Sequence, residues 1–488
     1  MIAVKLNRPE FEYDIHSLIK AFYPEEYVLV SAEEKEYEEP VDSYMCVEYK
    51  EDTIKIRWEG LQRDVPVTFS DRTDTKNRLK QALYEMLSAY TKKKLPWGTL
   101  TGIRPTKIPM KFLEEGKSEQ EITAYMEQTY FTSDEKIKLS IDIVKRELAL
   151  LDRIDYENGY SLYIGIPFCP TTCLYCSFTS YPLVSWSKRV DDYLDALEKE
   201  IDFTAVRFAG KHLNSIYIGG GTPTTLNPYQ LDRLIRKIKC SFDLSDCLEF
   251  TVEAGRPDSI TKEKLMVLRR HDISRISINP QTMKQETLDL IGRHHTVAQT
   301  IESFHMAREL GFDNINMDLI MGLPEETLDD VKRTMEQLMQ LEPDNITVHS
   351  LALKRAARLN MFKDDYKDFK MVNTQRHMDL TADYAQQMGM HPYYLYRQKS
   401  MAGNLENVGY AKEGKAGVYN ILIMEEKQTI MALGAGATTK FVKYQGEECD
   451  PKVLITRTEN VKDVKNYLER VDEMIERKNK KMEEISWH

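Results

Sequence analysis

The chain has 488 residues, of which 42% are hydrophobic and 30% are charged. This length exceeds the size of one ordinary core, so two or three domains are expected. No run of about 18 or more apolar residues occurs, which excludes a transmembrane helix of the usual length. The formal net charge of −11 argues against nucleic acid as the main ligand, because a polyanion is bound by a basic surface.

The cysteines and the N-terminal segment indicate a reducing compartment. Seven cysteines, an odd number with three gathered at one position, argue against a secreted disulfide framework. The segment that starts at Met1 is followed at once by charges and lacks the apolar region and cleavage site of a signal peptide. We therefore expect a cytoplasmic protein.

Residues 1–95 are expected to form an N-terminal α+β domain. Three strand-like runs come first, at Met1–Leu6, Tyr44–Tyr49 and Thr53–Trp58. The segment Asp71–Tyr90 follows, and its apolar residues recur with helical spacing.

Residues 96–155 are predicted to be a helical connector that opens with an irregular loop, Leu95–Lys107. The loop is rich in glycine, proline and threonine, which marks irregular backbone. Trp97 and Arg104 in this loop could face a ligand or a neighbouring domain. A packed connector between domains is an equally good interpretation.

From residue 156 to 353, short apolar runs alternate with helix-length segments. The six candidate strands are Ser161–Ile166, Ser215–Ile218, Leu248–Glu253, Ile273–Ile278, Ile315–Ile320 and Ile346–Leu351. This alternation predicts βα units and a parallel sheet, because a crossover between parallel strands needs a helix. Six units fall short of the eight of a closed barrel, so the predicted fold class is α/β, a partial (β/α)6 TIM-like barrel. Residues 354–488 follow as a C-terminal α/β extension.

Three cysteines, Cys169, Cys173 and Cys176, come directly after the first of these strands. Thiolates are the normal ligands of iron–sulfur clusters, and a four-iron cube has four irons to satisfy. Three cysteines therefore leave one iron open for a ligand that is not protein. A structural zinc site would need a fourth Cys or His at short spacing, and none follows Cys176.

The next two strands end in residues that suit a ligand. Gly219–Thr224 follows the second strand, and successive glycines let backbone approach a bound molecule closely. Glu253 ends the third strand, where its carboxylate could accept from an ammonium group. A salt bridge to Arg256 is the alternative for Glu253.

Further polar residues follow the fourth and fifth strands. Gln281 comes after the fourth strand, and Arg293 follows it with a planar guanidinium that suits a carboxylate. Asp318 lies towards the end of the fifth strand and suits a ribose hydroxyl. Together these side chains could hold a zwitterionic nucleoside beside the cluster. The adjacent His294 and His295 are expected at the surface or at a helix cap.

These motifs resemble the radical S-adenosylmethionine (SAM) superfamily, whose signature is a CxxxCxxC run with a tyrosine before its last cysteine. Over residues 155–440 they are similar to the oxygen-independent coproporphyrinogen III oxidase group. The similarity rests on Tyr163–Cys169, Gly219–Thr224, Arg275–Gln281 and Asp318–Pro324. The long N-terminal region with Leu95–Lys107 looks like that of the HemZ-type coproporphyrinogen dehydrogenases.

The resemblance implies a [4Fe-4S] cluster on Cys169, Cys173 and Cys176, with the SAM amino and carboxylate groups on the open iron. Further cofactor contacts are implied at the strand ends, at Tyr163, Gly220, Gly221, Thr222, Glu253, Gln281, Arg293 and Asp318. Gly220 and Gly221 would lie along the methionine, Glu253 near the amino group and Arg293 near the carboxylate. Gln281 and Asp318 would lie near the ribose, and Tyr163 would be a catalytic residue at the cofactor.

The activity implied by the resemblance is an oxidoreductase reaction of haem biosynthesis. One electron from the cluster would split SAM into methionine and a 5′-deoxyadenosyl radical, which takes a hydrogen from a propionate of coproporphyrinogen III. Loss of carbon dioxide and one electron would leave a vinyl group, and two rounds give protoporphyrinogen IX. The implied partners are this tetrapyrrole and an electron donor such as flavodoxin or ferredoxin, and a monomer is expected. Candidate contacts to the substrate carboxylates are Arg397, Lys399 and Arg104.

Two positions depart from the pattern of the decarboxylating enzymes. Those enzymes have a histidine two residues after the tyrosine, where this chain has Gly165. They also have a further cysteine two residues after the triad, where this chain has Phe178, as haem-chaperone-like members do. A haem-binding chaperone and another anaerobic radical SAM reaction on haem are therefore alternatives.

Overall fold

A computed structural model describes residues 1–24, 26–33, 40–352, 357–361, 369–398, 405–445 and 452–485. The chain divides into two compact units, residues 1–144 with 396–406 and residues 145–395 with 407–488. No helix among the described residues is both long and apolar enough to cross a membrane. Lys399, a predicted substrate contact, lies outside the described residues.

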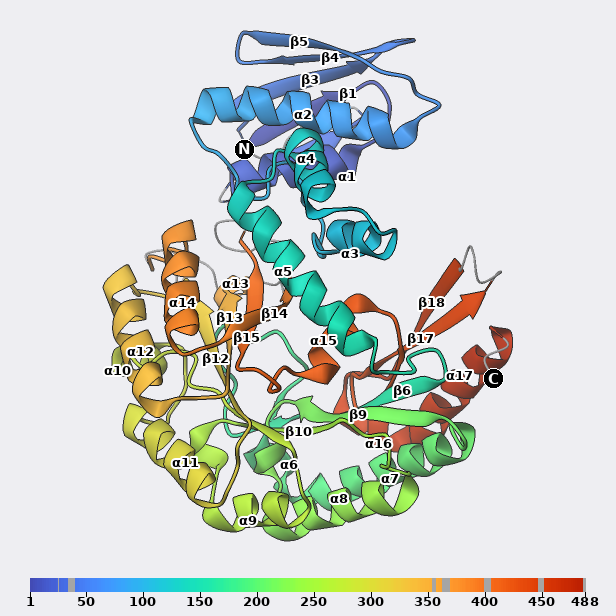
Figure 1. Ribbon diagram of the computed structural model, residues 1–488, viewed down its shortest axis with the longest axis vertical. Helices are drawn as coiled ribbons and strands as arrows, with labels where there is room; N and C mark the ends of the chain where they lie inside the picture. The colour runs from blue at the N-terminus through green and yellow to red at the C-terminus, as the bar shows by residue number, and fades with distance from the viewer. Residues whose placement is uncertain are drawn as a thin grey trace. The chain divides into compact units, whose positions relative to one another are not determined.

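The first unit contains a five-stranded sheet in the order β2-β1-β3-β4-β5. The strands are β1 (Ile2–Leu6), β2 (Val28–Ser31), β3 (Ser43–Tyr49), β4 (Thr53–Trp58) and β5 (Leu61–Pro66). Helices α1 (Glu12–Phe22) and α2 (Arg72–Thr91) pack against each other beside this sheet (Figure 1). The three predicted strands and the predicted helix are confirmed, whereas α1, β2 and β5 were not predicted.

The loop after α2 is packed inside the first unit and leads into α3 (Lys107–Glu114), α4 (Glu119–Tyr130) and α5 (Asp134–Leu151). Trp97 is fully buried, and its indole nitrogen donates to Glu406 over 2.7 Å. The guanidinium of Arg397 lies over the Trp97 ring and donates to the Leu100 carbonyl over 2.6 Å. Trp97 is therefore a packing residue. The Arg397 side chain is buried in this packing, and its contact to substrate stays a prediction.

Six parallel strands form the core of the second unit, in the order β6-β9-β10-β11-β12-β13. They are β6 (Gly159–Ile166), β9 (His212–Gly220), β10 (Glu249–Gly255), β11 (Arg275–Ile278), β12 (Ile315–Met321) and β13 (Asn345–Ser350). Figure 1 shows helices along their outer side: α7 (Val190–Arg207), α8 (Pro228–Ser241), α9 (Lys262–Arg270), α11 (Val297–Glu309) and α12 (Leu328–Leu341). The predicted partial (β/α)6 barrel is confirmed.

The C-terminal strands extend both edges of this same sheet. On one side lie β15 (Asn407–Ala411), antiparallel to β13, and then β14 (His391–Tyr396). On the other side β16 (Thr429–Leu433) runs parallel to β6, followed by β17 (Thr438–Gln445) and β18 (Lys452–Glu459). The predicted C-terminal α/β extension is thus continuous with the barrel sheet.

The strand register explains why the barrel interior is polar. Because side chains alternate between the two faces of a strand, Ser161, Tyr163 and Gly165 share one face of β6. The register pairs Ser161 with Ser215 and Tyr163 with Tyr217 on β9, and the two serine hydroxyls are 2.7 Å apart. Gly165 ends this row, and a Cβ there would lie 3.4 Å from both the Leu433 carbonyl oxygen and the Tyr163 ring.

Candidate active site

The cysteine loop starts where β6 ends. Cys169 is the last residue of the short strand β7 (Phe168–Cys169), and this strand pairs with β8 (Tyr181–Pro182). The two ends of the cysteine loop therefore lie side by side. A turn joins the other two cysteines, because the Cys176 amide donates to the Cys173 carbonyl over 3.2 Å. Cys169 and Cys173 are buried and Cys176 is half-buried. All three thiols therefore lie in one sheltered loop at the carboxyl end of the barrel.

Two neighbouring side chains contact the thiols. The Thr222 hydroxyl donates to Cys169 Sγ over 3.5 Å, and the Arg256 guanidinium lies 3.9 Å from Cys173 Sγ. Burial, together with the neighbouring Cys176 and Cys173 thiols, raises the pKa of the Cys169 thiol to about 11, although the hydrogen bond from Thr222 acts in the opposite direction. A bound cation is therefore needed if these sulfurs are all to be thiolates at the same time.

The glycine run at the end of β9 lies directly against the cysteine loop. The Gly221 amide donates to the Ile166 carbonyl over 2.8 Å, and the Thr222 amide donates to the Phe168 carbonyl over 2.7 Å. A Cβ on Gly221 would lie 2.7 Å from the Phe168 carbonyl oxygen and 3.0 Å from Cys169 Sγ. Gly220 adopts a φ of 109°, which side-chain-bearing residues rarely adopt. The motif therefore needs glycine for both space and backbone conformation.

Glu253 on β10 is a half-buried carboxylate with no ion pair among the residues that the structure describes. Tyr217 donates a short hydrogen bond to it. Desolvation, together with the charge of Asp318, raises the pKa of Glu253 to about 7, although the hydrogen bond from Tyr217 acts in the opposite direction. The alternative salt bridge to Arg256 does not form, because Arg256 pairs with Asp258 at 2.7 Å.

Gln281 and Asp318 are joined through their backbones. The Gln281 amide donates to the Asp318 carbonyl over 2.9 Å, and Gln281 adopts a φ of 69°, uncommon for a residue with a side chain. Its side-chain oxygen is buried and has no hydrogen-bond partner among the described residues. The Asp318 carboxylate accepts from Asn316 over 2.7 Å. Gln281 thus follows the end of β11, whereas Asp318 is the fourth of the seven residues of the neighbouring strand β12, not a residue at its end.

Arg293 is buried beside the cysteine loop. One terminal nitrogen donates to the Tyr175 hydroxyl over 3.0 Å and the other to the Asn279 carbonyl over 2.8 Å. Its Nε has no hydrogen-bond partner among the described residues. His294 is exposed, as one of the two expected positions requires, whereas His295 is fully buried and directly precedes Thr296, the residue that caps helix α11 (Val297–Glu309).

Comparison with known proteins shows which family the chain belongs to. The family model for the radical SAM superfamily matches residues 163–338. The oxygen-independent coproporphyrinogen-III oxidase-like protein HemZ of Bacillus subtilis is 43% identical, over 84% of this chain and 81% of the relative. The chain belongs to the radical SAM superfamily, among the oxygen-independent coproporphyrinogen III oxidase-like proteins.

Other proteins similar to this radical SAM protein are named either as heme chaperones or as coproporphyrinogen III oxidases. The heme chaperone HemW of Bacillus subtilis is 34% identical, over 64% of this chain and 76% of the relative. Among solved structures, coproporphyrinogen III oxidase (HemN) from Escherichia coli, described as a radical SAM enzyme, matches with a TM-score of 0.51 and 25% identity. That match covers 67% of this chain and 73% of the other chain, and it agrees with the partial barrel described above.

The cofactors of this superfamily, a [4Fe-4S] cluster and SAM, fit the residues present. Among the described residues, no three His, Cys, Asp or Glu side chains surround a single metal-ion position. A cube does not need such a site, because each thiolate binds a different iron. Bound iron also holds a thiol deprotonated, which removes the cost of gathering three buried sulfurs. Gly221 leaves the space beside Cys169 that a cluster and its ligand require.

Two tyrosines of the site were missed from the sequence. Tyr217 stacks between Tyr163, with ring centroids 6.3 Å apart, and Tyr419, with centroids 4.5 Å apart. Tyr217 could have been found, because it lies two residues before Gly219 on the same strand face. Tyr419 lies on α15 (Val418–Glu425), and no local pattern links it to the barrel.

Proposed function

We propose that this radical SAM protein catalyses the oxygen-independent oxidative decarboxylation of coproporphyrinogen III to protoporphyrinogen IX. The observation that carries the proposal is the gathering of the cysteine loop, the glycine run and buried polar side chains at one end of the barrel. Sequence similarity supports the substrate class, since a relative 43% identical is named as a coproporphyrinogen-III oxidase-like protein. When bound, the cluster and SAM supply the one-electron chemistry that starts hydrogen abstraction.

The residues of this chain bind and orient the cofactors in the proposed reaction. Cys169, Cys173 and Cys176 bind three irons, and Gly220, Gly221 and Thr222 line the methionine part of SAM. Glu253 accepts from the ammonium group, which supplies the cation that this carboxylate lacks. Arg293 binds the carboxylate, and Gln281, with its unpaired side-chain oxygen, binds the ribose together with Asp318. Tyr163 lies at the cofactor as the catalytic residue.

Further partners follow from the same proposal. The tetrapyrrole is the substrate, and a reduced one-electron carrier such as flavodoxin or ferredoxin supplies the electron. The protein acts as a monomer in the cytoplasm, whose reducing conditions suit free thiols.

Product analysis under anaerobic conditions tests the proposal. Cluster-reconstituted protein is incubated with SAM, a reductant and coproporphyrinogen III, and the porphyrins are separated after oxidation. We expect protoporphyrin IX from the wild type and from Cys240→Ala, because Cys240 is an exposed cysteine away from the loop. We expect none from Cys173→Ala, which should also lose the iron–sulfur absorbance. Formation of 5′-deoxyadenosine without any decarboxylated tetrapyrrole would contradict the proposed substrate.

A haem chaperone is the second candidate function. It is favoured by the similarity to the heme chaperone HemW and by Phe178, which is 70% exposed beside the cysteine loop. Titration of the reconstituted protein with haem separates the two candidates. Stoichiometric haem binding without protoporphyrin formation would favour the chaperone. Conversion of haem itself to a new product would indicate another radical SAM reaction.

A further inference from the structure

A second cavity, of about 510 Å³, lies at the opposite end of the barrel strands from the cysteine loop. Leu248, Ser274 and Asn314 line it, and each directly precedes one of the strands β10, β11 and β12. Ala411 also lines it and ends β15, which runs antiparallel to β13. The cavity is therefore at the amino end of the parallel strands, whereas the cysteine loop follows their carboxyl ends.

The length of the strands separates the two sites. β10 and β12, which begin directly after Leu248 and Asn314, each have 7 residues, and a strand rises about 3.3 Å per residue, so about 20 Å of strand lies between their ends. A small molecule in the second cavity does not reach the cysteine loop. The cavity is thus available for a ligand other than the cofactors.

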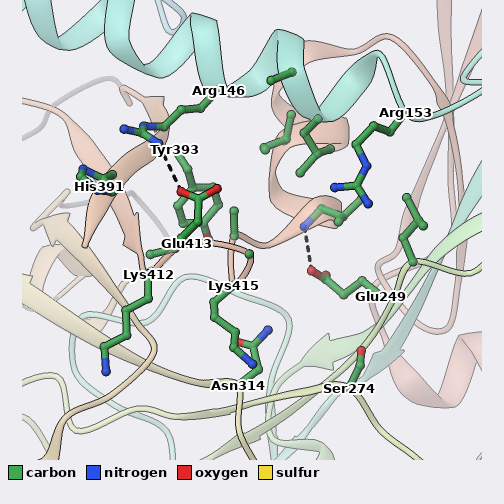
Figure 2. Close-up of a pocket in the computed structure, with 18 of the residues that line it drawn as sticks. Arg146, Arg153, Glu249, Ser274, Asn314, His391, Tyr393, Lys412, Glu413 and Lys415 are labelled. Carbon is green, nitrogen blue, oxygen red and sulfur yellow. Dashed lines mark hydrogen bonds and ion pairs between the residues drawn. The ribbon is translucent and has the colours of Figure 1, made fainter. Parts of the chain in front are cut away.

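Helix α5 provides one wall of the cavity. Arg146, Ala149 and Leu150 of this helix line it, together with Arg153, which lies two residues after the end of the helix. Figure 2 shows the Arg146 side chain extending from this helix and the Arg153 side chain extending from the turn that follows it.

The charge that the cavity offers to a ligand is positive. Arg153 makes no ion pair or side-chain hydrogen bond with the described residues. Arg146 pairs with Glu413, at 3.9 Å, as its one ion pair among the residues that the structure describes, and Glu413 is 91% exposed. Such an exposed ion pair contributes about 0–1 kcal/mol to stability, so an anionic ligand can replace Glu413 beside Arg146 at little cost in free energy. Lys415 is already paired with Asp313 at 3.1 Å.

Glu249, the buried acid that lines the cavity, already accepts hydrogen bonds from the backbone. The Glu249 carboxylate accepts from the Val418 amide over 2.7 Å and from the Tyr419 amide over 3.4 Å, at the start of α15 (Figure 2). Behind it, Arg275 is fully buried, and two of its guanidinium nitrogens have no partner among the described residues. No free anion of the described chain therefore neutralises Arg146 and Arg153 from this side.

Apolar side chains make up the remaining surface of the cavity. Leu248, Val418 and Ile421 line it together with the ring of Tyr393. Small-molecule sites are commonly apolar pockets with a few polar groups that fix orientation, and this volume is within their usual range.

We propose that this cavity binds a small organic molecule with two anionic groups, carboxylate or phosphate, on an apolar body. Each arginine fork binds one oxyanion through paired hydrogen bonds. The apolar body lies against Leu248, Val418 and Ile421. This site is separate from the proposed decarboxylation and does not depend on it.

Equilibrium dialysis of the cluster-loaded protein, with saturating SAM, tests the proposal with two probes. Biphenyl-4,4′-dicarboxylate represents the carboxylate source and hexane-1,6-diyl bisphosphate the phosphate source. We expect at least one to bind with one equivalent, and its affinity to fall at least tenfold in Arg146→Gln/Arg153→Gln. Comparison of the two probes identifies which acid group the site prefers.

A matched variant controls for the loss of two positive charges. Arg207→Gln/Arg376→Gln removes two exposed arginines that do not line the cavity, so binding should be unchanged. The iron–sulfur absorbance shows that each variant is folded. Equal binding by the wild type and the Arg146→Gln/Arg153→Gln variant, or binding of neither probe to the wild type, would overturn the proposal.

Discussion

Among single residues, Glu253 is a half-buried carboxylate whose proton affinity depends on the groups beside it. Burial raises its pKa from the ordinary value of 4.5 to about 7, and Tyr217 donates a hydrogen bond to it. An ammonium group nearby would favour the ionised form and lower this pKa again. The same carboxylate therefore costs stability in the empty site and provides a contact for a cationic ligand.

Glu253→Gln should flatten the pH dependence of stability in SAM-free protein. Because the folded-state pKa is raised, the stability that protonated Glu253 contributes is complete below pH 4.5 and is lost as the pH rises through about 7. The loss is about 3 kcal/mol. Urea unfolding at several pH values measures it. The wild type should lose more stability than the variant over this window, and parallel curves would contradict the assignment.

Gly221→Ala should prevent normal cluster assembly. The added Cβ would lie 2.7 Å from the Phe168 carbonyl oxygen and 3.0 Å from Cys169 Sγ, so the loop must move. Iron content and iron–sulfur absorbance after reconstitution should fall by more than half. Gly102→Ala is the matched control, because a Cβ there has nothing within 4 Å. Full cluster content in Gly221→Ala would show that the close approach is not required.

Among the elements, β16 and the loop after it connect the C-terminal helices to the site. Glu200 on α7 and Lys478 on α17 (Val471–Glu484) form a fully buried ion pair. Glu200 also accepts from the Gly434 amide over 2.8 Å, and Lys478 donates to the Ala432 carbonyl over 2.7 Å. The loop that follows lines a cavity of about 280 Å³ with Tyr163 and Phe178. This ion pair thus fixes one wall of the site.

Lys478→Met should destabilise the second unit by about 3–5 kcal/mol, because it leaves the Glu200 carboxylate buried without its cation. The double variant Glu200→Gln/Lys478→Met removes both charges and should be more stable than Lys478→Met alone. Urea unfolding followed by tyrosine fluorescence compares the three proteins. If Lys478→Met were as stable as the wild type, the buried pair would not hold α17 and the loop together.

For the whole molecule, the parallel barrel was predictable because each buried strand is a nearly continuous apolar run. The helix-length segments between these strands are helices in the structure, among them α7 and α12. The position of the cysteine loop also followed from the sequence, since it comes directly after a predicted strand. Local patterns were sufficient for these features.

Features that join distant parts of the chain were not predictable in the same way. β16 pairs with β6 although more than 260 residues separate Tyr160 from its partner Thr429. Glu200 and Lys478 are 278 residues apart, and neither stands out in its own helix. Tyr419 likewise reaches the site from a segment with no motif. One sequence shows local periodicity, but it does not show which distant segments pair.

Transfer of a hydrogen isotope tests the central claim most directly, that this site starts radical chemistry on a tetrapyrrole side chain. The reconstituted protein is incubated anaerobically with SAM, a reductant and coproporphyrinogen III deuterated on its propionate side chains. The proposal predicts deuterium in the 5′-deoxyadenosine, together with protoporphyrin IX after oxidation. Unlabelled 5′-deoxyadenosine with intact coproporphyrin would contradict it.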